Sequence, residues 1–265
     1  MMTEPRSGIS PSAARDSLWS FAVQHPVRYL WGLAADAWIF VSTIVLGLLA
    51  ITATLISRSG RPIDVLGRLW GRWIVWACGI DLEIDGLERL VPGQSYVLIS
   101  NHLSNFDIWC TLGFMPFTVR FVAKRELYRL PVFGQALALS EHIVIDRQNP
   151  QEAIERINAA AARTPEGIGI LFYAEGTRSR DGTIREFKKG GVSLALRAGL
   201  PIVPVSVSGT RKFLPRGCAV IRPGGRVRLV LSQPIPTAGL PFEARDELNE
   251  RVRDIVVSNY SQDLT

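Results

Sequence analysis

The sequence predicts an α/β protein, with a largely parallel twisted sheet flanked by helices and preceded by an N-terminal membrane-embedded helical segment. Three observations support this prediction. A charge-free apolar run lies near the N-terminus, and short apolar runs alternate with helical stretches through the rest of the chain. The third observation is composition: of 265 residues, 47% are hydrophobic and 20% are charged, which excludes disordered and fibrous proteins.

The balance of charge and the cysteine content narrow the class further. The net charge is +6, and between Glu175 and Leu229 twelve Lys and Arg residues stand against three acidic ones. Such a basic region predicts a phosphorylated or otherwise anionic partner. The three cysteines are odd in number and form no Cys-x-x-Cys pair, which excludes a disulfide framework and disfavours a structural zinc site. We therefore expect the soluble part to face a reducing compartment.

The first predicted element is the apolar run Ala37–Ile56, which carries no charge over twenty residues. At about 1.5 Å per residue, a helix of this length can cross a bilayer core of roughly 30 Å. The run is preceded by more than thirty residues and is followed by no Ala-x-Ala site, so an anchor is favoured over a cleaved signal peptide. A buried core helix is the other interpretation. Residues 1–17 are expected to form a loose tail.

The second element is the segment Pro62–Cys78, whose apolar residues recur at helical spacing with Trp70, Trp73 and Trp76 among them. Such a helix suits the membrane interface. Four arginines follow the apolar run within twenty residues, whereas one precedes it at the same distance, so the large C-terminal part should face the cytoplasm. We therefore expect residues 18–79 to anchor the protein to the cell membrane, either as a full span or as a hairpin.

Residues 80–265 are expected to form an α/β domain with strands joined by helices. The expected strands are Leu82–Ile84, Ser95–Ser100, Val119–Val122, Ile143–Ile145, Ile168–Phe172, Ile202–Val207 and Val227–Leu231. The expected helices are Phe106–Gly113, Pro131–Leu139, Pro150–Ala162, Lys188–Ala198 and Phe242–Ser258. This alternation predicts βαβ units, with the functional residues in loops at the strand ends.

The first candidate site follows the strand Ser95–Ser100 in the stretch NHLSNFD, which contains His102 and Asp107. Imidazole is a common general base near neutral pH, and a carboxylate can hold its second nitrogen in the required tautomer. On an ideal helix, side chains five residues apart point about 140° away from each other. The two groups therefore meet only if His102 precedes a helix and Asp107 lies on its first turn, with Ser104 or Asn105 as the N-cap.

Two further stretches follow predicted strands. In YAEGTRS, Gly176 frees the backbone for a turn, while Thr177 and Arg178 supply hydroxyl and guanidinium donors of the kind that bind phosphate. Glu175 is either part of this site or the ion-pair partner of Arg178. In IVIDR, Arg147 lies just past a strand, where a ligand could reach it.

The stretches NHLSNFD, IVIDR, YAEGTRS and IVPVSV, in this order, resemble the four sequence blocks of the 1-acyl-sn-glycerol-3-phosphate acyltransferase family, from about Leu82 to Val230. The resemblance implies that His102 deprotonates the acceptor hydroxyl and that Asp107 orients His102. It also implies that the glycerol phosphate is held by residues of the second and third blocks, namely Arg147, Glu175, Gly176, Thr177 and Arg178.

The same resemblance implies the reaction and its partners. A fatty acyl group would pass from acyl-CoA or acyl carrier protein to the sn-2 hydroxyl of lysophosphatidic acid, giving phosphatidic acid at the bilayer. The thioester is a substrate, so neither a cofactor nor a metal is expected. Three positions depart from the usual blocks: Ala174 replaces a Pro, Glu141 a Gly and Val144 a Phe. These changes surround the acceptor site, so a lysophospholipid or a lyso-ornithine lipid remains the alternative acceptor.

Other classes fit the sequence less well. The stretch Gly191–Ala195 nearly reads Gly-x-Ser-x-Gly, but a serine hydrolase of that type needs a His after the Ser, and His25, His102 and His142 all precede it. A metal hydrolase would need more ligands near His102. A nucleic-acid binder would not explain the anchor, and a non-enzymatic membrane adaptor, the alternative from a different class, would not need a His/Asp pair beside Arg-bearing loops.

Overall fold

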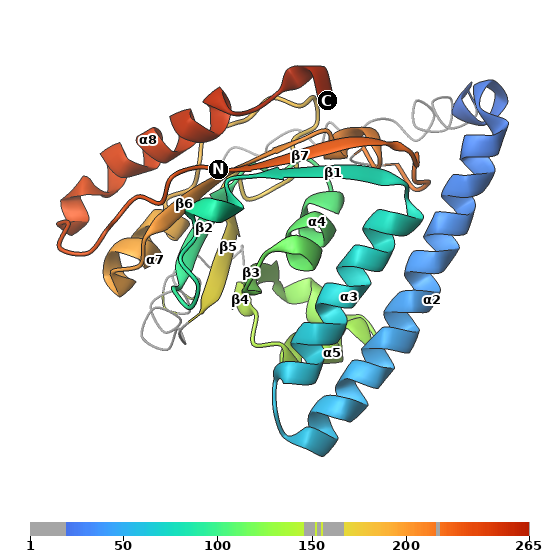
Figure 1. Cartoon of the computed structure of the whole chain (residues 1–265), viewed down its shortest axis with the longest axis horizontal. Coiled ribbons are helices and arrows are strands. Elements are labelled where there is room, and N and C mark those ends of the chain that lie inside the picture. The colour runs from blue at the N-terminus through green and yellow to red at the C-terminus, as the bar shows by residue number, and fades with distance from the viewer. Residues whose placement is uncertain (1–19, 146–151, 153–154, 156–166, 216–217, 265) are drawn as a thin grey trace, which may run out of the picture.

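The computed structural model describes residues 20–145, 152, 155, 167–215 and 218–264 (Figure 1). Its strands are β1 (Ile80–Asp85), β2 (Tyr96–Ser100), β3 (Thr118–Lys124), β4 (Ile143–Ile145), β5 (Ile168–Tyr173), β6 (Ile202–Ser208) and β7 (Gly225–Leu231). They form one seven-stranded sheet in the order β1-β7-β6-β2-β5-β3-β4. All neighbouring strands are parallel except β6 and β7, which are antiparallel. The predicted largely parallel sheet is confirmed.

The helices of the described residues also follow the predicted order. They are α2 (Pro26–Ser57), α3 (Arg61–Ala77), α4 (Phe106–Phe114), α5 (Phe133–Leu139), α7 (Gly190–Ala198) and α8 (Arg245–Ser258), together with short 3-10 turns that include η3 (Thr210–Lys212) and η4 (Phe242–Ala244). The last expected helix is divided between η4 and α8. Of the expected helix Pro150–Ala162, the structure describes only Glu152 and Glu155, both in helical conformation.

Helices cover both faces of the sheet, as the apolar strands require. In β2, Tyr96 and Leu98 join one apolar core with residues of α3 and α4, whereas Val97 and Ile99 join a second core with residues of α7 and α8. Figure 1 shows α3 and α4 on one side of the sheet and α7 and α8 on the other. Every residue of β2 and β6 is buried, so the two strands at the centre have no solvent-exposed face. Polar side chains that could contact a ligand therefore lie in the segments that follow the ends of these strands.

The helices α2 and α3, called the helix pair below, form a hairpin on the α4 side of the sheet (Figure 1). A stripe of small and apolar residues of α2 is buried, consisting of Gly32, Ala35, Ser42, Leu46, Ala50 and Thr54. The opposite side of the pair leaves large apolar side chains exposed, among them Leu30, Phe40, Val45, Leu49 and Ile56 of α2 and Val65, Trp73 and Trp76 of α3. Within the described residues, α2 alone is long and apolar enough to cross a membrane, and 22% of its apolar stretch is buried.

The helix α2 begins well before the charge-free run, because its two charged residues bind the segment that leads into β7. The Arg28 guanidinium donates to the carbonyl of Pro223 at 2.6 Å, and Asp36 accepts from the backbone of Ile221 at 3.3 Å. Gly32 allows this contact, since a Cβ there would lie 2.1 Å from the Ile221 carbonyl oxygen. The N-terminal part of α2 is thus bonded to the sheet domain.

Candidate active site

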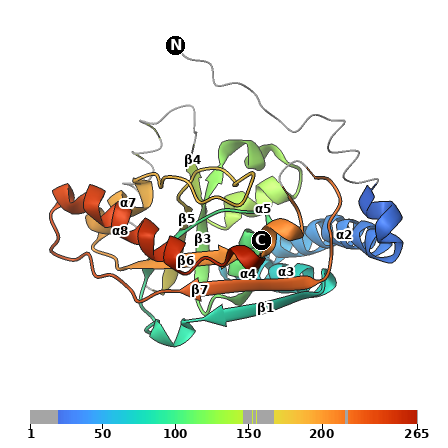
Figure 2. The same cartoon turned by 90° about the horizontal axis from the view of Figure 1, so that it is seen from above.

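The strands β2, β5 and β6 lie side by side in the middle of the sheet and run in the same direction (Figure 1). Figure 2 shows the same sheet from above, with β5 and β6 labelled. Their carboxyl ends therefore open at one edge, which is where ligands bind in open parallel sheets. Three segments leave the strands there: 101–107 after β2, 174–179 after β5 and 209–212 after β6. We call the polar residues of these three segments the catalytic edge.

His102 and Asp107 meet at the catalytic edge in the arrangement that their spacing requires. Asp107 lies on the first turn of α4, and His102 lies in the loop before it. The Nδ1 atom of His102 is 2.7 Å from Oδ2 of Asp107. The Asp107 side chain is fully buried, whereas 12% of the His102 side chain is exposed. The imidazole thus has one nitrogen inside the protein and an accessible edge outside it.

The Asp107 carboxylate is the centre of this network. Its Oδ2 atom also accepts from the backbone N–H of Leu103 at 2.7 Å and of Ser104 at 3.0 Å. Its Oδ1 atom accepts from the Thr210 hydroxyl at 2.5 Å. Because every partner donates, the bond to His102 places the imidazole proton on Nδ1 and leaves the lone pair on Nε2. This is the tautomer that a general base needs.

Asn101 fixes the loop that carries His102. The residue is fully buried, its amide nitrogen donates to the Val207 carbonyl at 2.9 Å, and its amide oxygen accepts from the Val207 N–H at 2.8 Å. Both bonds cross from the end of β2 to β6. The Asn101 side chain thus extends the hydrogen bonding between β2 and β6 by one residue. These two bonds hold the first residue of the loop against β6.

The segment after β5 holds the other side of His102. Glu175 accepts from the His102 N–H at 2.9 Å through Oε1, and the Ser179 N–H donates to the His102 carbonyl at 2.7 Å. The Oε2 atom of Glu175 accepts from the backbone and the Nε of Arg185 at 3.2 and 3.4 Å. The structure pairs Glu175 with Arg185, whereas the ion-pair alternative in the sequence named Arg178. Direct contact of Glu175 with substrate stays a prediction.

The remaining residues of the third block lie at the same edge. Gly176 has φ = 72°, a left-handed conformation that favours glycine, and a Cβ there would lie 3.1 Å from Nζ of Lys188. Thr177 and Arg178 are partly exposed, and the Thr177 carbonyl accepts from Arg185 at 2.9 Å. The structure thus gathers cationic side chains around this turn. Arg147 lies outside the described residues, so its place beside the turn stays a prediction.

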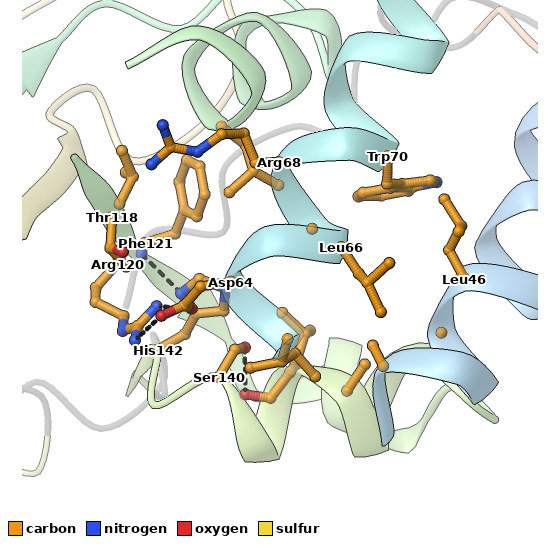
Figure 3. A pocket seen from close by; sticks show the side chains of 18 of the residues that line it. Leu46, Asp64, Leu66, Arg68, Trp70, Thr118, Arg120, Phe121, Ser140 and His142 are labelled. Atoms are coloured by element: carbon orange, nitrogen blue, oxygen red, sulfur yellow. Dashed lines mark hydrogen bonds and ion pairs between the residues drawn. The ribbon is translucent and has the colours of Figure 1, made fainter. Parts of the chain in front are cut away.

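A mostly apolar cavity of about 120 Å³ lies between the helix pair, α5 and β3 (Figure 3). One wall carries the ion pair between Arg120 and Asp64, with nitrogen-oxygen distances of 2.5 and 3.0 Å. Beside it, Nδ1 of His142 accepts from the Phe121 N–H at 3.0 Å. Burial and the nearby Arg120 charge lower the pKa of His142 to about 3, so this imidazole is neutral and structural.

Sequence reasoning missed residues whose contacts are distant along the chain. Thr210 lies 103 positions after Asp107, and Val207 lies 106 after Asn101. No local pattern announces either contact. Arg185 was counted only as one of many basic residues, although its spacing of ten from Glu175 is short.

Comparisons with known proteins identify the family to which the chain belongs. The acyltransferase family model matches residues 81–208. A 1-acyl-sn-glycerol-3-phosphate acyltransferase of Limnanthes douglasii is 34% identical over 197 residues, which cover 74% of this chain and 69% of the relative. The enzyme of that name from Pseudomonas aeruginosa is 33% identical over 187 residues, covering 69% of this chain and 71% of the relative.

A solved structure shares the fold. The crystal structure of the 1-acyl-sn-glycerophosphate acyltransferase of Thermotoga maritima aligns with a TM-score of 0.71 at 23% identity, over 88% of this chain and 97% of that chain. The sequence matches, which include the His102 and Glu175 stretches within the family model, extend this likeness beyond the fold. The chain is an acyltransferase and belongs to the 1-acyl-sn-glycerol-3-phosphate acyltransferase family.

Proposed function

We propose that the protein transfers a fatty acyl group from a thioester to the sn-2 hydroxyl of lysophosphatidic acid. The observation that carries this proposal is the bond between His102 Nδ1 and the buried Asp107, which leaves Nε2 as a base at the exposed end of a parallel sheet. The names of relatives more than 30% identical to this chain supply the acceptor.

The reaction follows from this tautomer. Nε2 of His102 removes the proton of the acceptor hydroxyl as that oxygen attacks the thioester carbonyl. The tetrahedral intermediate then collapses, the carbon–sulfur bond breaks, and the imidazolium returns the proton to the departing thiolate. The Asp107 carboxylate orients the ring and stabilises the imidazolium. No acyl-enzyme is required, and burial raises the pKa of the Cys110 thiol on α4, which makes it a poor nucleophile.

The acceptor phosphate is assigned to the turn after β5. Arg178, together with Arg147, supplies guanidinium groups that pair bidentately with phosphate, and Thr177 adds a hydroxyl. Lys188, whose side chain covers Gly176, adds a further positive charge on the same turn. Glu175 supports this turn because its carboxylate accepts hydrogen bonds from the His102 loop and from Arg185.

We further propose that the helix pair attaches the protein to the membrane from the cytoplasmic side. The buried stripe of α2 continues from Gly32 to Thr54 and packs against the rest of the protein, so α2 does not stand free as a lone transmembrane helix would. Its exposed apolar side and Trp76, which is 77% exposed, are suited to lipid. This arrangement supports the hairpin over the full span, and in this proposal the catalytic edge meets lysolipid in the leaflet.

The test is a product assay with the purified full-length protein in lipid vesicles. Acceptors would be lysophosphatidic acid, lysophosphatidylcholine and lyso-ornithine lipid, and donors would be acyl-CoA and acyl carrier protein thioesters. We expect phosphatidic acid as the main product with at least one donor. Faster acylation of another lysolipid would overturn the acceptor assignment, and no acylation of any acceptor would favour a non-enzymatic adaptor.

A further inference from the structure

Tyr173 lies against the predicted base, although it belongs to none of the residues assigned above. It is the last residue of β5 and lies opposite Ser100 of β2 in the sheet register. This register brings its side chain beside the loop that begins at Asn101. The ring centroids of Tyr173 and His102 are 4.1 Å apart, and the two ring planes differ by 15°. The phenol thus lies flat on the imidazole.

The Tyr173 ring has a second near-parallel aromatic neighbour. Phe121 of β3, which lines the apolar cavity, stacks at 6.5 Å between centroids with an interplanar angle of 17°. Three near-parallel rings from β3, β5 and the His102 loop thus lie next to one another at the sheet edge. Because Tyr173 belongs to β5 and has this neighbour on β3, its ring presents a fixed surface to His102.

The Tyr173 hydroxyl gives a second reason to assign a role to the ring. Its oxygen is buried and makes no hydrogen bond within the described residues, which is uncommon for a buried hydroxyl. The nearby Thr111 hydroxyl donates instead to the Asp107 carbonyl at 2.7 Å. Burial and the Asp107 charge raise the pKa of Tyr173 well above its usual value, so the phenol stays neutral.

We propose that Tyr173 is a positioning residue whose ring fixes the plane of the His102 imidazole. The bond to Asp107 holds one point of the imidazole, at Nδ1, and a flat contact holds its plane. Both constraints together aim Nε2 at the acceptor hydroxyl. The electron-rich face of the phenol also favours the imidazolium that forms as the proton is taken. This inference rests on the proposed role of His102 as the base.

The experiment compares Tyr173→Leu with Tyr173→Phe in the full-length protein, with kcat expressed per folded molecule. Tyr173→Leu removes the flat ring, and we expect kcat to fall about 10- to 100-fold at nearly unchanged acceptor and donor KM, as for a misaligned catalytic group. Tyr173→Phe keeps the ring and loses only a hydroxyl without a partner. We expect it to restore near wild-type kcat and to be at least as thermally stable.

The matched control is Tyr96→Leu, which removes a fully buried ring from the opposite end of β2. It should lower the melting temperature without lowering kcat of the folded protein. Near wild-type kcat in Tyr173→Leu, or an equal loss in Tyr173→Phe, would overturn the proposal. His102→Ala separates the proposed base from the proposed role of Tyr173. If His102→Ala stays active, the proposed base is wrong. If His102→Ala is inactive and Tyr173→Leu stays active, only the role of Tyr173 fails.

Discussion

At the catalytic edge, the buried polar groups of Asn101, Asp107 and Glu175 bind protein partners, whereas on the outer side of the helix pair large apolar side chains are left exposed. The first region depends on individual bonds of 2.5 to 3.4 Å, some of which join residues more than one hundred positions apart in sequence. The second depends on the total apolar area that it presents. Single substitutions should therefore have large effects at the catalytic edge and small effects on membrane attachment.

The largest effect is expected for His102→Ala. Removing the base should lower kcat by about 10³-fold or more with the fold intact, by analogy with other catalytic dyads and triads. The side chain is partly exposed, and its one side-chain hydrogen bond within the described part of the chain is to Asp107, so the melting temperature should change little. The measurement is phosphatidic acid formation by the purified variant in vesicles. Near-normal turnover would refute the mechanism.

The next largest effect is expected for Arg178→Lys, because lysine cannot reproduce the bidentate contact of a guanidinium with phosphate. Loss of one charge-assisted contact, about 1.5 to 3 kcal/mol, should raise the acceptor KM about 10- to 100-fold. Arg147→Lys should behave in the same way. The informative comparison is the acceptor KM against the donor KM. A fall in kcat alone, with the acceptor KM unchanged, would mean that these residues do not bind the phosphate.

A smaller effect is expected at Thr210, which bonds Asp107 but does not contact His102. Thr210→Val keeps the shape and loses the donor, so kcat should fall about 10-fold through poorer orientation of Asp107. Thr210→Ser keeps the hydroxyl and should retain most of the activity. Steady-state kinetics on both variants check this. Equal losses in the two variants would show that packing matters there and not the hydrogen bond.

The smallest effect is expected from salt on membrane attachment. At 1 M salt, charges separated by more than about 3 Å are screened, whereas apolar contact with lipid persists. The full-length protein should therefore stay in the membrane pellet in 1 M salt and be released by detergent. Release by salt without detergent would show that the basic surface, and not the helix pair, holds the protein at the membrane.

The two regions also differ in how far the sequence predicts them. All the expected strands occur because each is a short apolar run, and the His102 and Asp107 pair was predictable because five residues and one helix start define its geometry. Thr210 and Tyr173 depend on strand order, which places β6 and β5 beside β2. No local pattern encodes that order, so their roles became visible only in the structure.

For the helix pair, the sequence predicts the apolar character but not the position at which α2 begins. Its apolar character is evident from composition, but the start of α2 at Pro26 was not predictable, because charged residues normally end a membrane segment. Arg28 and Asp36 are tolerated within the helix because Pro223 and Ile221, almost two hundred residues later, bind them. The sequence indicates the apolar character of the helix, and the tertiary contacts decide where the helix begins.

Direct transfer of the acyl group to lysophosphatidic acid can be tested by measuring thiol release and lipid product together. With acyl donor and lysophosphatidic acid, the wild-type protein should release one thiol for each phosphatidic acid formed. Without acceptor, there should be no thiol burst and no gain in protein mass. A stoichiometric burst with an acylated protein, or thiol release without phosphatidic acid when the acceptor is present, would contradict the account.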